Sequence, residues 1–245
     1  MPGTVPTAQG FVQAPDSVLV VVAHPDDIDF GTAGTMALLT QAGTRVAYCL
    51  VTSGDAGDDD LTRSSDELAA ERIAEQTEAA RIVGVTEIHW LGHPDGMVVA
   101  DLALRRDIAR VIRQVRPDVV ITPSPTPNWD RIYGAHPDHL AAATATMAAV
   151  YPDSRNPRAF PELLDEGWEP HKVTEVWMMM QEPNRFVDIT DTFDLKVAAL
   201  RAHVSQTARI DDLEGLLRQW ASDQAGSGGM AEGRLAEAFR VIDTG

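Results

Sequence analysis

The chain has 245 residues, 44% hydrophobic and 23% charged, which is ordinary for a globular protein of one large α/β domain or two small ones. Its 37 Asp and Glu residues outnumber 20 Lys and Arg residues, and the net charge of −17 argues against nucleic acid or an anionic membrane as partner. Such a charge suits a neutral or cationic substrate or a bound cation, although solubility alone explains it more simply.

The N-terminal residues 1–16 are rich in proline and glycine, and we expect a flexible lead-in followed by a single domain over residues 17–245. The run 18–23 is apolar and mostly β-branched, which predicts a strand buried on both faces. Further strands are expected at 44–51, 87–91, 117–122, 173–180 and 186–189. Helices are expected at 31–43, 65–83, 102–115, 137–150 and 192–205, and over most of the remaining residues apart from 226–229.

Strand and helix alternate four times along the first part of the chain. This order predicts a doubly wound, Rossmann-like fold, with a mainly parallel sheet, right-handed crossovers and helices on both faces. Cys49 is the only cysteine and lies in the second predicted strand, so we expect a buried free thiol. The N-terminus lacks the basic start and apolar core of a signal peptide, and no apolar stretch approaches the roughly 18 residues that span a bilayer. We therefore predict a cytoplasmic protein.

Two polar clusters follow buried strands. His24-Pro25-Asp26-Asp27 comes after the first strand, and His136-Pro137-Asp138-His139 comes after the fourth. The carboxyl ends of these two strands can be neighbours at the switch point of a doubly wound sheet, where ligands bind. Either cluster alone is weak evidence, because histidine often ends a strand and Asp often begins a helix. Two such clusters, each after a buried strand, favour a metal site over loops whose polar groups are simply hydrogen-bonded.

A catalytic zinc takes three protein ligands and leaves the fourth position to water. His24, Asp27 and His139 can supply two imidazoles and one carboxylate, with one zinc per chain. Asp26 is then free to act as general base on the bound water, whose pKa the metal lowers from about 15.7 toward roughly 7. His136 can stabilise the oxyanion or protonate the leaving amine, and Asp138 can hold a histidine in the right tautomer.

Other polar residues are less specific. Asp95 follows His93-Pro94 in a turn that is equally consistent with a plain rim and with substrate contact. His203 is either a core histidine or a remote wall of the pocket, and we favour the pocket. Asp29 and Asp55 are expected in loops or at the rim. Arg72 lies in the middle of a predicted helix, where a solvated face is the default.

The two clusters resemble the signature of the LmbE-like, or PIG-L, deacetylase family. The resemblance extends from about residue 17 to 206 through 52–57, Glu71-Arg72, 94–96 and 196–206. It implies a zinc-dependent enzyme that removes an N-acetyl group from a glucosamine-containing small molecule, with the zinc ligands and the roles of Asp26 and His136 given above. It also implies that Arg72 meets substrate. Many members have Glu directly after the Asp pair, where this chain has Ile28 and then Asp29, and Asp29 is a candidate substitute.

Two alternatives remain open from the sequence. One is hydrolysis of another amide, such as a mycothiol-type conjugate, and the other is a non-catalytic metal-binding or sugar-binding module. Specificity is expected in the loops 124–135 and 151–172, which contain Trp129 and Trp168; a packed role is favoured for both over stacking on a sugar. Tyr133 is a further pocket candidate. A homo-oligomer is compatible with the sequence, which does not define one.

Overall fold

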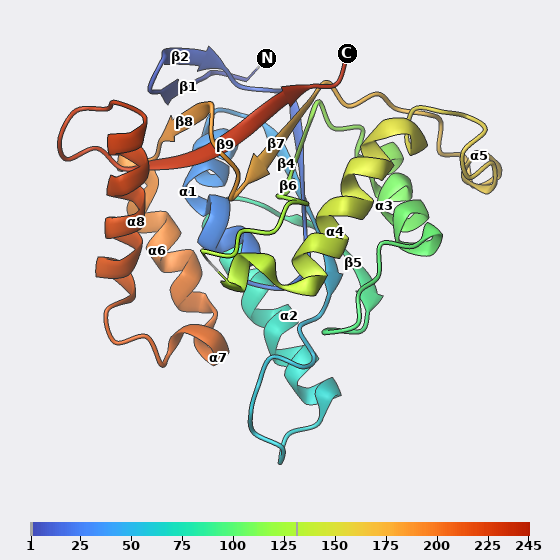
Figure 1. Ribbon diagram of the computed structural model, residues 1–245, viewed down its shortest axis with the longest axis horizontal. Helices are drawn as coiled ribbons and strands as arrows, with labels where there is room; N and C mark the ends of the chain where they lie inside the picture. Colours follow the sequence, from blue (N-terminus) through green and yellow to red (C-terminus); the bar gives the residue numbers. More distant parts are fainter. Residues whose placement is uncertain (1, 131) are drawn as a thin grey trace.

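Strand β3 (Ser17–Val22) lies in the middle of the sheet and is buried on both faces, as its apolar sequence predicts (Figure 1). Its alternate side chains enter two different cores: Val18, Val20 and Val22 pack on one side of the sheet. Leu19 and Val21 pack on the other. The computed structural model describes residues 2–130 and 132–245.

The centre of the sheet is parallel and its flank is antiparallel. The parallel part joins β3 to β4 (Arg45–Thr52), β5 (Glu87–His93), β6 (Val119–Pro123) and β7 (Glu175–Met179). The antiparallel part consists of β9 (Ala236–Asp243), β8 (Arg185–Asp188), β1 (Thr4–Thr7) and β2 (Gly10–Gln13). Within the described residues the order is β2-β1-β8-β9-β7-β6-β3-β4-β5.

Helices cover both faces of this sheet, which confirms the doubly wound architecture. One face packs against α1 (Asp27–Gln41), α2 (Ser65–Ile82), α6 (Phe193–Ala202) and α8 (Leu213–Ser227). The other packs against α3 (Leu102–Val115) and α4 (Pro137–Ala148). Figure 1 shows α6 and α8 side by side on the left and α3 and α4 on the right. The short helical segments are η1 (Ile132–Ala135), η2 (Ala149–Asp153), α5 (Glu162–Asp165), η3 (Thr190–Thr192) and α7 (Val204–Thr207).

The strand order reverses at β3. From β3 the chain proceeds outward through β4 and β5, and then returns to place β6 on the other side of β3. The predicted first and fourth strands are therefore neighbours, and their carboxyl ends form the crevice where doubly wound folds bind ligands. Cys49 is a buried free thiol in β4, as predicted. Among the described helices, none is long and apolar enough to cross a membrane, and the cytoplasmic location stays a prediction.

The N-terminal segment differs from the flexible lead-in expected over residues 1–16. Residues 4–13 form the hairpin β1–β2, and β1 pairs with β8 through Thr7 and Val187. Val5 and Thr7 alternate toward the interior, which is the pattern of a half-buried strand. Pro6 is tolerated because β1 pairs with β8 only at Thr7, which leaves Pro6 outside the ladder on that side.

The C-terminal segment also differs from the prediction. The sequence after residue 229 was expected to be helical, and β9 instead inserts between β7 and β8. Ala236, Glu237 and Ala238 have low strand propensity, which explains the error. Pairing on both sides, together with burial of Phe239, outweighs that local preference.

Candidate active site

The turn after β3 carries the first polar cluster, His24–Asp27. Asp26 adopts φ of 85° and ψ of −27°, in the left-handed region that is uncommon for residues other than glycine. Helix α1 begins directly after it at Asp27, ahead of the start predicted at Gly31. The Asp27 carboxylate accepts a hydrogen bond from the backbone N–H of His24, with 2.9 Å from N to Oδ2. This turn therefore holds Asp27 next to His24.

The second cluster occupies the start of α4. His136 is the N-cap residue and Pro137 is the first helical residue, where its missing N–H costs nothing. The backbone N–H of Asp138 donates to Nδ1 of His136, 3.2 Å away. Because Nδ1 accepts, the proton of a neutral His136 lies on Nε2, which makes that atom a hydrogen-bond donor.

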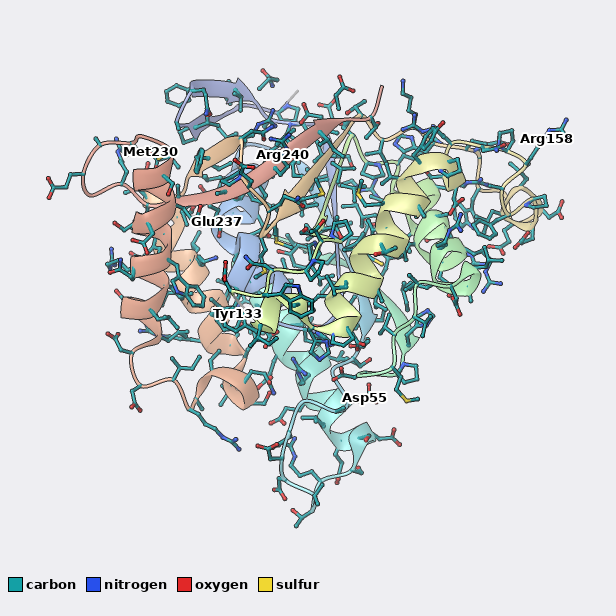
Figure 2. All side chains as sticks on the ribbon, viewed as in Figure 1. Asp55, Tyr133, Arg158, Met230, Glu237 and Arg240 are labelled. Carbon is teal, nitrogen blue, oxygen red and sulfur yellow. The ribbon has the colours of Figure 1, made fainter. Side chains whose placement is uncertain are left out.

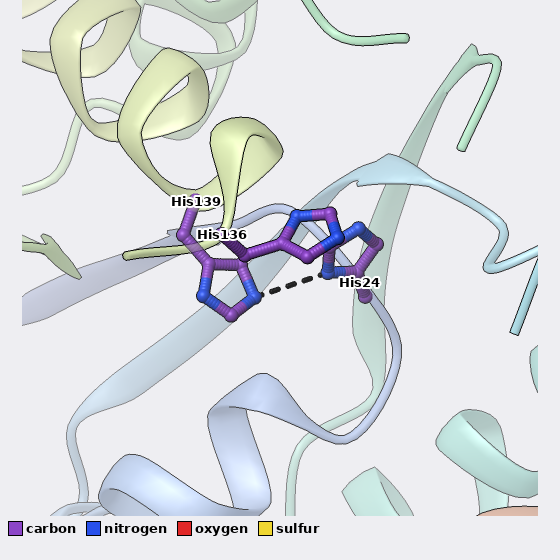
Figure 3. A group of neighbouring side chains, drawn as sticks. All are labelled: His24, His136 and His139. Atoms are coloured by element: carbon purple, nitrogen blue, oxygen red, sulfur yellow. Dashed lines mark hydrogen bonds between the residues drawn. The ribbon is translucent and has the colours of Figure 1, made fainter. Parts of the chain in front are cut away.

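The two clusters meet at the switch point (Figure 3). Nδ1 of His24 lies 3.1 Å from Nε2 of His139. The Asp27 carboxylate joins them, with Oδ1 3.0 Å from His139 Nε2 and Oδ2 3.5 Å from His24 Nδ1. Tetrahedral zinc with ligand distances of about 2.0–2.1 Å keeps neighbouring ligand atoms about 3.3 Å apart. The spacing of these donor atoms therefore fits one small metal ion.

His136 lies beside this group. Its ring centroid is 5.0 Å from that of His24 and 5.3 Å from that of His139. One nitrogen from each of the three histidines falls within 4.8 Å of the others, so His136 could itself hold a metal. Asp27 contacts His24 and His139 directly, and the structure describes no such contact to His136. The geometry thus favours His136 as a neighbour of the ligand set.

Two carboxylates hold the far side of the His24 ring. Its Nε2 lies 3.0 Å from Asp95 Oδ1 and 3.3 Å from Asp138 Oδ2. Asp138 accepts two further hydrogen bonds, from the backbone N–H groups of Gly96 at 2.7 Å and Val98 at 3.2 Å. Carboxylates in this position fix the orientation of a ligating histidine.

The structure narrows the expectations for these two carboxylates. Asp138 has a side chain only 1% exposed and contacts His24, which fits the positioning of a histidine and not a direct catalytic role. Asp95, a candidate for either substrate contact or a plain rim, instead contacts His24 and has a side chain 8% exposed. These residues support the site from behind.

The charge of the cluster favours a bound cation. Burial opposes protonation of His24, but Asp27 and Asp95 raise its pKa to about 10. Burial also opposes protonation of His139, and the Asp27 carboxylate raises its pKa. Burial alone would raise the pKa of Asp27, yet His139 and His24 hold it well below its usual range. The carboxylates thus favour positive charge on the neighbouring histidines, and a bound metal ion can supply that charge in place of protons.

The Asp26 side chain lies close to helix α2. Its Oδ2 lies 3.5 Å from Nη2 of Arg72, and its side chain is 16% exposed. Burial and the adjacent Asp27 charge raise the pKa of Asp26 to about 7, against the opposing effect of Arg72. A carboxylate with a pKa near neutrality suits proton transfer at physiological pH.

Two side chains of α2 hold the turn that contains Asp26. Arg72 donates to the carbonyl oxygens of Pro25 at 2.8 Å and Gly54 at 3.1 Å. Gln76 accepts from the backbone N–H of Asp26 at 2.9 Å. Arg72 is only 3% exposed, so the structure contradicts both its predicted contact with substrate and the solvated face. Gln76 was missed, although its position one turn after Arg72 places both on one helix face.

His203 belongs to the interior. Its Nε2 lies 2.8 Å from Asp29 Oδ2, and both side chains are fully buried. Gln76 donates to the same Asp29 oxygen at 2.8 Å. The pocket role favoured for His203 is therefore wrong and the core alternative holds, while Asp29 is a buried residue of α1 instead of a rim carboxylate. Through Gln76 this pair supports the backbone of Asp26.

The fold and the site together define a class of protein. It is a doubly wound α/β protein with a possible histidine and carboxylate metal site at its switch point, next to a carboxylate suited to proton transfer. The family model described as PIG-L, GlcNAc-PI de-N-acetylase, matches residues 19–150. The chain belongs to the PIG-L deacetylase family.

Individual relatives agree with this assignment. The diacetylchitobiose deacetylase of Thermococcus kodakarensis is 37% identical over 190 residues, covering 77% of this chain and 69% of the relative. A 1D-myo-inositol 2-acetamido-2-deoxy-α-D-glucopyranoside deacetylase of Saccharopolyspora erythraea is 34% identical over 223 residues, which cover 81% of this chain and 76% of the relative. The structure of the N,N'-diacetylchitobiose deacetylase of Pyrococcus horikoshii superposes with a TM-score of 0.84 at 33% identity, covering 93% of this chain and 84% of the other. These relatives are deacetylases of glucosamine-containing compounds.

Proposed function

We propose that this protein is a zinc-dependent N-deacetylase that hydrolyses the acetamide of a glucosamine-containing small molecule. The observation that carries the proposal is the convergence of His24 Nδ1, His139 Nε2 and the Asp27 carboxylate beside Asp26. The relatives named above act on acetylated amino sugars, which supports this class of substrate. We also propose that the protein acts in the cytoplasm.

His24, Asp27 and His139 would hold one zinc ion per chain. Their donors are two imidazole nitrogens and a carboxylate, a ligand set that zinc accepts in catalytic sites. Zinc in this place supplies a Lewis acid for the acetamide carbonyl and lowers the pKa of water from about 15.7 toward about 7. Asp95 and Asp138 keep the His24 ring in the orientation that presents Nδ1.

Asp26 is the general base of the proposed reaction. It accepts a proton from the attacking water and passes it to the leaving amine, so that acetate and free amine result. Its backbone is fixed by Gln76 and its carboxylate lies near Arg72, which keeps it in one position. Fixed placement of a base contributes to the rate because little reorganisation is needed when the proton moves.

His136 is the proposed hydrogen-bond donor to the carbonyl oxygen. Burial and the nearby His24 and His139 lower its pKa, so it is neutral at pH 7. Its proton lies on Nε2 because the Asp138 N–H occupies Nδ1. A donor aimed at a developing oxyanion stabilises the transition state more than the ground state.

The test measures metal content and the release of amine from N-acetylglucosamine and diacetylchitobiose. We expect about one zinc per chain and turnover that a chelator abolishes and zinc restores. The Asp26→Asn variant should keep its zinc and lose about 10²- to 10⁴-fold in kcat. The matched control is Asp59→Asn, which makes the same change at an exposed residue of another loop.

Near-wild-type turnover of Asp26→Asn would contradict the role of the base. Zinc binding without hydrolysis of any amide would instead support the non-catalytic module. Hydrolysis of other amides but of no acetylated amino sugar would support the broader amidase alternative.

A further inference from the structure

A cavity of about 770 Å³ opens beside two of the proposed zinc ligands, Asp27 and His139. It extends from them between α1, the end of β7, β9 and α8. Figure 2 labels two residues that line it, Tyr133 before α4 and Glu237 on β9, both on the side of α4 that faces α8. The cavity is thus continuous with the proposed active site, and a bound substrate can reach into it.

The walls of this cavity are mainly apolar. Helix α8 contributes Leu217, Trp220 and Ala221, and the opposite side includes Phe30 and Met179. The rings of Phe30 and Trp220 lie 6.4 Å apart between centroids, inclined by 53°. Aromatic and aliphatic walls of this kind bind ligands through removal of apolar surface from water.

Two charged residues of the lining, Lys196 and Glu237, neutralise each other. Lys196 donates to Glu237 at 2.6 Å and to the carbonyl oxygens of Asp29 at 3.0 Å and Phe30 at 2.7 Å, which uses all three of its donors. Glu237 also accepts from the backbone N–H groups of Gly34 and Thr35. Neither of these two charges is available to a ligand, and the surface around them is mainly apolar.

The size of the cavity exceeds what an acetamide alone requires. Sites of about 300–1,000 Å³ hold drug-sized ligands and are mostly apolar with a few polar groups. Here Asn128, Gln181 and Gln224 provide uncharged amides among the lining residues. We infer that the substrate carries an apolar chain or ring system that occupies this cavity while its amide lies at His24, Asp27 and His139. The inference rests on the proposed deacetylase function and specifies its substrate class.

The apolar group could be attached on either side of the scissile amide, and the substrates tested distinguish the two. One series carries methyl, butyl and octyl groups on the anomeric oxygen of N-acetylglucosamine. The other replaces the N-acetyl group of methyl glucosaminide by butanoyl and octanoyl. We expect kcat/KM to rise by about fourfold per methylene over the first few carbons in one of the two series. A flat response in both would overturn the inference.

A variant that introduces a charge into the cavity tests the role of its apolar wall. Leu216 on α8 is half-buried and lines the cavity. In the series that responds to chain length, Leu216→Lys should bring the ratio of kcat/KM between the longest and shortest compounds close to one. Ser222→Lys makes the same addition of charge at an exposed position of α8 outside the lining and should leave the ratio unchanged. Equal ratios in wild type and Leu216→Lys would contradict the role of this wall.

Binding is measured separately from turnover. The longest and shortest compounds of both series are titrated calorimetrically into the zinc-loaded Asp26→Asn variant, and we expect the longest compound of one series to bind at least tenfold more tightly than the shortest. If such a preference is measured but the wild type hydrolyses no amide, the proposed function fails while the apolar binding in the cavity is retained. If acetamides are hydrolysed but chain length changes binding in neither series, the proposed function stands and the inference fails.

Discussion

The two sides of the site use their polar groups in opposite ways. On the His24 side, carboxylates surround imidazoles and the pKa of His24 is raised to about 10, so this side retains a cation. On the α8 side, Lys196 and Glu237 cancel each other and the remaining surface is mainly apolar. The first arrangement suits chemistry and the second suits recognition.

The two sides also come from different parts of the chain. The proposed ligands, Asp26 and His136 all lie within residues 19–150, which match the PIG-L family model. The apolar wall comes largely from residues 179–238, beyond that match. A reaction shared by a family can thus be combined with a binding surface that another segment of the chain contributes.

The largest expected effect concerns the metal side. His139 is one of three proposed ligands and contacts both His24 and Asp27. Its replacement in His139→Ala should therefore abolish both zinc binding and turnover. Metal analysis after gel filtration measures the first and amine release the second. His89→Ala, at a histidine on β5, is the control and should keep both. Unchanged zinc in His139→Ala would remove His139 from the ligand set.

The next effect tests whether the ion pair of Lys196 and Glu237 in the cavity wall stabilises the fold. Lys196→Met leaves the buried Glu237 without its cation, and loss of one partner of a buried ion pair costs about 3–5 kcal/mol in free energy of unfolding. Urea denaturation measures the loss. Arg81→Ala breaks an exposed pair with Glu78 and should cost far less, because solvent screens that pair. A double variant, Lys196→Met with Glu237→Gln, should recover part of the loss.

A smaller effect is expected from the carboxylate behind His24. Asp138→Asn removes a charged acceptor from the His24 ring while keeping its size, and zinc affinity should fall about 10- to 100-fold. Competition with a chelator of known affinity measures the change. Asp130→Asn, at an exposed residue in the preceding loop, makes the same substitution away from the histidines. Equal affinities in wild type and Asp138→Asn would show that Asp138 does not tune the site.

The pH response should separate the two sides. The pKa of His24 is raised to about 10, so His24 holds a proton near neutrality in the metal-free protein, and zinc must displace this proton. Zinc affinity should consequently fall as the pH decreases, by about tenfold per pH unit for each proton displaced. Calorimetry at pH 8, 7 and 6 measures this slope. The octyl-to-methyl ratio should stay constant over the same range if the cavity wall has no titrating contact with the ligand.

The sequence determined the central sheet and the two clusters that meet on it. The apolar run before His24 makes β3 a strand buried on both faces. Strand–helix alternation allows β6 to lie beside it, and the structure shows that it does. Local chemistry was sufficient there, because periodicity and the position after a strand are properties of neighbouring residues. The sequence also identified His24, Asp27 and His139 as candidates that the structure brings together.

The surroundings of these residues depend on contacts between distant parts of the chain. Gln76, Asp29 and His203 are far apart in the sequence, and nothing local shows that they form one buried hydrogen-bonded group. Arg72 and His203 were expected at the substrate and lie in the interior instead, because their partners come from other elements. β9 likewise forms against its own propensity because β7 and β8 pair with it, and it thereby completes the wall of the cavity. Long-range pairing and burial decide such features, and they depend on the whole folded chain.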